Sequence, residues 1–323
     1  MANKKITELQ LVSAVTSDLN FPCDDTLQTY RATIAQLKTF LTPIYIPPVV
    51  QRITATGSGT FYRTRAFIVS GASCTVGATY THNSVTWTVV RTVSSSNIVY
   101  MSGNGTPLSS GTLTKSAGTG DSSIAFTEYR NSVYMNVILT GGGGGGGGAG
   151  GSATNGNDGA DTTFTANLTA GKGLKGNGNA GGTGQGGSNS VSATTGQQIL
   201  KNAPGGSGQY SGYATSATST TSGLGGVSYW GGSADNAKTA GANSGSGGGG
   251  GYNNGLASST GAYGGDGGGA GGTLEAVLSD SALATSYSYS VGAGGTGGSG
   301  SGTGQTNGGH GAAGVIIVSE HFQ

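Results

Sequence analysis

Polar and apolar residues alternate over short stretches between residues 49 and 140, and clusters of Ser, Gly, Asn and Asp separate these stretches. A period of two is typical of strands that bury one face, and closely spaced turn residues are typical of small all-β domains. The clearest strands predicted here are 86–93 and 97–101, and a further strand is predicted at 132–140. The pattern therefore predicts a small all-β spacer module over residues 44–130.

The first 43 residues contain few large apolar side chains. Residues 29–33 predict a strand, and Thr33 to Gln36 then matches the Thr-x-x-Gln capping box that begins a helix. Pro43 ends that helix. Because a segment this short rarely sustains its own core, we expect residues 1–43 to depend on packing against a partner.

Glycine dominates the remainder of the chain. Nine of the 68 glycines lie before residue 141, and Gly141 to Gly148 form an uninterrupted run. Further on, glycine recurs at every third position in several places, for example at Gly292, Gly295 and Gly298. Period three is the repeat of a polyproline-II-type helix, whose backbone N–H and C=O groups point outward. Buried, such groups need partners on neighbouring segments, and only glycine permits that approach.

A flexible Gly/Ser linker is the alternative interpretation of this composition. Strand-like stretches at 273–279 and 286–291 interrupt the glycine-rich part, and 315–318 ends it with a purely apolar run. A linker has no need of side chains to bury. We therefore predict a mainly β protein whose residues 131–323 form a glycine-rich domain with polyglycine-II-type helices bracketed by β-strands.

Composition and charge narrow the classes of function. The net charge is +1, 8% of residues are charged, and no basic run exceeds Lys4 and Lys5, so we expect no nucleic-acid partner. The two cysteines form no zinc or disulfide pattern, and no apolar stretch has the length of a membrane span or of a secretory signal. We expect no cofactor.

Paired catalytic groups are also missing from the sequence pattern. The carboxylates of the glycine-rich part are scattered through turn contexts, and the three histidines have no companion at ligand or nucleophile spacing. We therefore predict that the protein is not an enzyme. Residues 155–161 form an oxygen-rich turn that calcium could occupy, although their spacing matches no known calcium loop, and we interpret them as a turn.

Aromatic residues are placed among Ser, Gly and Asn in several predicted loops, which is the composition of adaptable binding surfaces. The candidate binding residues are Tyr210, Tyr213, Tyr229, Trp230, Tyr252, Asn253 and Tyr263. The same rings could instead fill gaps between glycine helices. Binding is favoured most for Tyr229 and Trp230, because two residues adjacent in sequence cannot easily both point inward.

Three blocks of sequence carry a family resemblance. They are 4–9 with 30–37; 77–83, 103–107, 110–115 and 118–121; and 137–141, 289–298 and 311–320. With these blocks the chain resembles tail-fibre or receptor-binding proteins of tailed bacteriophages that end in a glycine-rich domain. In adhesins of the T-even type, similar tips are built from packed polyglycine-type helices and bind through the loops at one end.

The resemblance implies a division of labour along the chain. Residues 1–43 would attach the protein to phage tail or baseplate proteins in the virion, after assembly in the host cytoplasm. Residues 131–323 would bind a host bacterial surface receptor, which could be lipopolysaccharide, capsule or an outer-membrane protein. Fibres of this kind are usually threefold, so a homotrimer is expected. The candidate attachment residues are Ile6, Leu9, Arg31, Ile34 and Leu37.

Two other functions stay open at this point. A spacer or decoration protein of the tail would carry the same glycine-rich part without binding a receptor. A fibre that depolymerises polysaccharide is the third and less favoured alternative, because it would need paired carboxylates.

Overall fold

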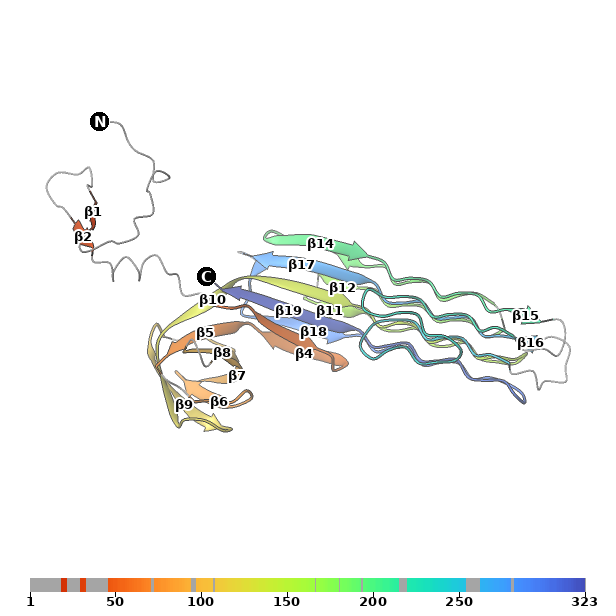
Figure 1. Ribbon diagram of the computed structural model, residues 1–323, viewed down its shortest axis with the longest axis horizontal. Helices are drawn as coiled ribbons and strands as arrows, with labels where there is room; N and C mark the ends of the chain where they lie inside the picture. The colour runs from red at the N-terminus through yellow and green to blue at the C-terminus, as the bar shows by residue number, and fades with distance from the viewer. Residues whose placement is uncertain are drawn as a thin grey trace, which may run out of the picture. The chain divides into compact units, whose positions relative to one another are not determined.

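The chain divides into two compact units, Met1–Tyr45 and Ile46–Gln323, which are considered separately (Figure 1). The computed structural model describes residues 19–21, 30–32, 46–70, 73–93, 97–106, 108–165, 167–179, 181–192, 194–214, 220–253, 262–279 and 282–322. This part of the chain is mainly β and contains no α-helix, which confirms the predicted class. In the first unit, β1 (Leu19–Phe21) pairs antiparallel with β2 (Tyr30–Ala32), and β2 lies within the strand predicted at 29–33. The helix expected after it lies outside the described residues.

Six antiparallel strands close into a small barrel in the second unit. In sheet order they are β5 (Thr64–Val69), β8 (Ile98–Gly103), β7 (Val85–Val93), β6 (Thr79–His82), β9 (Gly111–Ala117) and the first part of β10 (Ser123–Thr140), which pairs back with β5. Alternation along β7 turns Trp87 and Val89 inward, where Trp87 packs edge-on against Phe67 with ring centroids 5.4 Å apart. Closure leaves the barrel without a free strand edge.

Strand β10 continues from the barrel into a β-sandwich, which we call the base sandwich. Its second half pairs with β17 (Thr273–Ser279) on one side and β19 (Val315–Phe322) on the other. The predicted boundary at residue 130 therefore falls inside one 18-residue strand. The backbone thereby links the barrel directly to the glycine-rich part.

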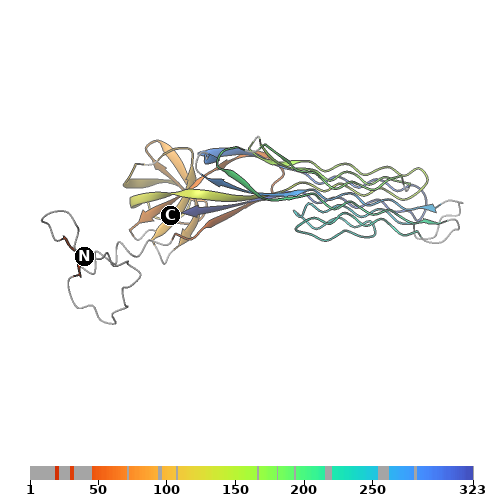
Figure 2. The same ribbon diagram turned by 90° about the horizontal axis from the view of Figure 1, so that it is seen from above.

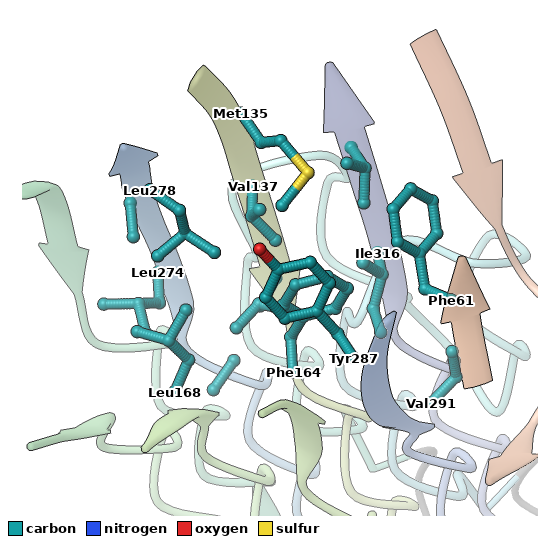
Figure 3. Close-up of a cluster of buried hydrophobic side chains, with 14 residues drawn as sticks. Phe61, Met135, Val137, Phe164, Leu168, Leu274, Leu278, Tyr287, Val291 and Ile316 are labelled. Carbon is teal, nitrogen blue, oxygen red and sulfur yellow. The ribbon is translucent and has the colours of Figure 1, made fainter. Parts of the chain in front are cut away.

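Two sheets pack face to face at the base of the glycine-rich part (Figures 1 and 2). One sheet runs β14 (Gln197–Ala203), β17, β10, β19 and β3 (Val49–Ile53); the other runs β13 (Ser190–Val191), β12 (Leu168–Ala170), β11 (Thr162–Phe164), β18 (Ser286–Val291) and β4 (Gly57–Tyr62). Side chains from both sheets, such as Met135 and Leu274 from one and Phe164 and Tyr287 from the other, form one buried core (Figure 3).

The spacer module predicted over 44–130 is corrected at its start. Strands β3 and β4 were assigned to it, but they pair with β19 and β18 and so belong to the base sandwich. Phe61 of β4 lies in the sandwich core, with its ring centroid 5.8 Å from that of Phe164. The chain thus contributes two strands to the sandwich before it enters the barrel.

A buried carboxyl group joins the barrel to the sandwich. Glu320 of β19 is fully buried and accepts hydrogen bonds from the backbone N–H of Thr64 at 2.8 Å, from the Gln51 amide at 3.2 Å and from the Ser132 hydroxyl at 3.4 Å. Burial raises the pKa of Glu320, and these hydrogen bonds offset the increase only in part. The folded protein therefore binds this proton more tightly than the unfolded chain does.

Between the base and the opposite end, irregular segments run side by side along the long axis of this unit (Figures 1 and 2). We call these stretches the glycine segments: 141–149, 153–161, 171–178, 183–188, 204–211, 220–227, 233–241, 244–252, 263–272, 292–301 and 305–314. Apart from the turn bond from the Lys238 N–H to the Asp235 carbonyl, their backbone hydrogen bonds run between segments rather than within them. These segments are therefore held to one another, unlike the flexible linker that was the alternative interpretation.

Segment 141–149 lies in the interior, with six described neighbours. Its N–H groups donate in rotation to the antiparallel segments 263–272, 153–161 and 305–314. Its C=O groups accept in rotation from the parallel segments 171–178, 244–252 and 292–301. Successive bonds to one neighbour are three residues apart, as from Gly144 to Gly269 and from Gly147 to Asp266. The run of eight glycines is therefore the segment that is enclosed on all sides.

A second interior segment follows the same rule. Residues 263–272 donate to 244–252, 171–178 and 204–211, and accept from 141–149, 183–188 and 220–227. A Cβ atom on most of these glycines would overlap a backbone carbonyl group of the next segment. This spacing excludes side chains from most positions of the two interior segments; the exceptions are Ala149, Tyr263, Asp266 and Ala270.

The packing predicts opposite outcomes for two Gly→Ala substitutions. In Gly145→Ala the new methyl group would overlap the carbonyl oxygen of Thr296, so the free energy of unfolding should fall by about 3 kcal/mol or more. Gly151 has no atom within 4 Å of its Cβ position, and Gly151→Ala should change stability by less than about 0.5 kcal/mol. Chemical denaturation of both variants measures this difference; equal losses would contradict the packing described here.

The buried Glu320 predicts a pH dependence. Because its pKa is raised in the folded state, its contribution to stability is largest below the ordinary carboxyl pKa of about 4.3 and declines as the pH rises. Relative to Glu320→Gln, the wild type should therefore lose unfolding free energy as the pH rises from about 4 to about 8. Denaturation series at several pH values test this; a shift in favour of the wild type would mean that the carboxylate is stabilised instead.

Candidate functional site

The connections farthest from the base sandwich gather at one end of the glycine segments. We call this the distal end and define it by the described residues 149–153, 178–179, 181–183, 210–214, 220, 252–253, 262–263 and 300–306. Its described parts are tied together by backbone bonds, such as Gly150 N–H to Tyr263 O and Thr306 N–H to Tyr252 O, both 3.0 Å. The short strands β15 (Tyr213–Ala214) and β16 (Ala262–Tyr263) pair there (Figure 1).

An interior carboxylate holds two of these connections. Asp266 is fully buried in segment 263–272. Its Oδ1 accepts from the backbone N–H of Ser211 at 2.8 Å and the Ser211 hydroxyl at 3.0 Å, and its Oδ2 accepts from Gly182 N–H at 2.9 Å. The sequence interpretation treated Asp266 as a solvated turn carboxylate, which is wrong. The signal that could have identified it is its position as the single charged residue in an otherwise glycine-rich run.

Five of the seven candidate binding residues lie at the distal end. Tyr210 lies near the distal end of segment 204–211 and is 71% exposed, whereas Tyr252 and Tyr263 are half-buried. The backbone of Tyr213 pairs with that of Tyr263. Asn253 is buried and its N–H donates to the hydroxyl of Thr220 at 3.1 Å, so it supports the connections rather than presenting a surface.

The other two candidates, Tyr229 and Trp230, lie at the base. The indole N–H of Trp230 donates to the hydroxyl of Thr140 at 3.0 Å, where β10 ends and segment 141–149 begins. Tyr229 lies under Lys201 of β14, whose ammonium nitrogen is 3.6 Å from the ring centroid. Both rings are exposed, as their adjacency predicted, with centroids 4.8 Å apart. The structure therefore separates the candidates into a distal group and a basal pair.

Residues 155–161, interpreted from the sequence as a turn, instead run along segment 153–161 and form a ladder of hydrogen bonds at one edge. Three side-chain oxygens spaced three residues apart each accept a backbone N–H from the neighbouring segment: Asn155 from Gly178, Asp158 from Lys175, and Asp161 from Lys172, at 2.8 to 3.0 Å. These donors point away from the interior segments, so side-chain oxygens replace backbone carbonyl groups at this edge.

Asp158 is also paired with a cation of the chain. Its second oxygen lies 3.3 Å from the ammonium group of Lys172. Burial alone would raise the pKa of Asp158, but the Lys175 N–H and Lys172 together outweigh it, so the pKa lies below its ordinary value. Both carboxylate oxygens are thus engaged by groups of the protein itself.

Of the five candidate attachment residues, only Arg31 lies among the described residues. Arg31 lies in β2, paired with Asn20 of β1. Ile6, Leu9, Ile34 and Leu37 lie outside the described residues. Their role stays a prediction from sequence.

The bonds of Asp266 predict that it stabilises the distal end. In Asp266→Asn one oxygen becomes an NH₂ group facing the Gly182 N–H, and a buried donor without a partner costs about 1 to 3 kcal/mol. The exposed pair of Asp235 and Lys238, 2.9 Å apart, provides the control: Asp235→Asn should cost less than about 0.5 kcal/mol. Denaturation, with hydrogen exchange of the Gly182 and Ser211 amides, measures both; unchanged exchange in Asp266→Asn would contradict this role.

Among the described residues, no group of three or more His, Cys, Asp or Glu side chains is placed to hold a metal ion, and no helix could span a membrane. No family model matches the chain, and neither a curated protein nor a solved structure matches it.

Proposed function

We propose that the chain is a bacteriophage tail-fibre protein that binds a receptor on the host cell surface through its distal end. The observation that carries this proposal is the gathering of polar, tyrosine-bearing connections at one end of a set of segments whose interior is backbone. Binding residues are commonly found on loops that a rigid scaffold positions. The family resemblance of the three sequence blocks supports the same function.

The glycine segments are, in this proposal, polyglycine-II-type helices. Three features support it: the hydrogen bonds of the interior segments repeat every three residues, these bonds run between segments, and an interior segment has six neighbours. A polyproline-II-type helix has three residues per turn and no internal hydrogen bonds. Such a bundle fixes the distal connections without needing side chains in its core.

Residues 1–43 complete the proposal as the attachment segment to the phage tail, with the protein acting as a homotrimer in the virion. A chain that docks by one end and binds by the other needs a stiff middle. The strand β10, which runs from the barrel into the sandwich, and the hydrogen-bonded glycine segments supply that stiffness between residue 123 and the distal end.

Substitution of Tyr210 tests the location of the site. Because this side chain is exposed at the distal end, Tyr210→Ala should leave stability within about 0.5 kcal/mol of wild type and weaken cell binding about tenfold. The measurement is flow cytometry of the labelled full-length protein on a panel of bacterial strains.

The basal aromatic pair is the matched control. Tyr229→Ala with Trp230→Ala removes two exposed rings and should leave binding unchanged, because Trp230 is bonded to Thr140 and Tyr229 contacts Lys201, both at the base. Loss of binding in this variant alone would move the site to the base. A wild-type protein that labels no strain would instead support the spacer or decoration protein.

A further inference from the structure

Charged side chains are absent from the distal end. The described residues that form it include no Asp, Glu, Lys, Arg or His. The carboxylate of Asp266 lies beneath it, but it is fully buried and bonded to Gly182 and Ser211. On the flank, beside Gly249 and Gly250, Asp235 and Lys238 pair with each other. The distal end thus presents no net charge to a ligand.

An uncharged surface is poorly suited to an anionic ligand. A phosphate or carboxylate loses strong hydration on binding, and proteins usually compensate with Arg or Lys side chains that form charge-assisted hydrogen bonds. The lysines nearest in sequence, Lys172 and Lys175, lie along segment 171–178 below the distal end, and Lys172 is paired with Asp158. Nothing in the distal sequence replaces them.

The groups that the distal end does present are neutral. Tyr210, Ser152 and Thr303 are exposed on three different connections, and Tyr252 and Tyr263 are half-buried. A tyrosine ring provides a flat apolar face with a polar tip, and hydroxyl and amide groups both donate and accept hydrogen bonds. An uncharged saccharide has the complementary chemistry, since its rings combine apolar C–H faces with hydroxyl groups.

We infer that the distal end binds an uncharged saccharide of the host cell surface, and this inference rests on the receptor-binding function proposed above. Binding of this kind needs no ion pair. Because salt screens only interactions between charges, the affinity should be independent of ionic strength. A strongly charged receptor would show the opposite behaviour.

The experiment uses polysaccharide extracted from a strain that the wild-type protein labels, separated by anion exchange into neutral and acidic fractions. Immobilised fractions are tested by biolayer interferometry with the full-length protein at about 20 and about 500 mM NaCl. We expect binding to the neutral fraction, with an affinity that changes less than about twofold between the two salt concentrations. The labelled cells are tested in parallel after periodate oxidation of sugars or after protease treatment.

Several outcomes would overturn the inference while the receptor-binding function stands. These are binding to the acidic fraction alone, a loss of more than about tenfold at the higher salt concentration, or cell binding that resists periodate and is lost with protease. The last outcome would indicate a protein receptor. If the protein labels no strain at all, the proposed function itself fails, so the two failures are distinguishable.

Three variants sharpen the assignment. Tyr210→Phe keeps the ring face and should retain binding to the neutral fraction within about threefold, whereas Tyr210→Ala loses about tenfold. Gln209→Lys places a cation beside Tyr210 without burying it, because Gln209 is exposed. With an uncharged saccharide this variant should bind within about twofold of wild type and acquire no dependence on salt. Tighter, salt-sensitive binding of Gln209→Lys would show that the natural ligand is anionic.

Discussion

The hydrogen bond between the backbones of neighbouring glycine segments is the interaction on which the rest of the structure depends. It forms only if segments approach so closely that a Cβ atom would overlap the next carbonyl group, as at Gly145 against Thr296. Each N–H or C=O left inside without a partner would cost about 1 to 3 kcal/mol. Most interior positions of this part must therefore be glycine, and every interior donor must find its acceptor in register.

That register is set at the base, where side chains can specify it. Segment 141–149 continues directly from β10, segment 263–272 leads into β17, and segment 305–314 leads into β19. These three strands are neighbours in one sheet, and their Met135, Leu274 and Ile316 side chains lie in one buried core. Glycine cannot distinguish one register from another by packing, so the sandwich aligns the segments before they leave it.

Sequence reasoning predicted individual strands, but not which strands pair when they lie far apart in the chain. The strands at β7, β10, β17, β18 and β19 follow from alternation, and the period of three predicts segments that bond sideways. The partners of β3 and β4 could not be predicted, because they lie more than 200 residues further along the chain. Tyr229 and Tyr210 were grouped as candidates although they lie at opposite ends of the glycine segments, because a sequence does not reveal at which end a connection lies.

A core made mostly of backbone separates stability from surface variation more fully than a core made of side chains. Exposed residues such as Tyr210 and Gln209 can change without repacking the interior, because nearly all interior residues are glycine. Asp266 is the exception, since its carboxylate lies inside and its bonds end on Gly182 and Ser211. A substitution that changes the paths of these two connections must still offer N–H donors to that carboxylate. Asp266 therefore limits how freely this end of the molecule can diverge, and it does so through three hydrogen bonds rather than through packing.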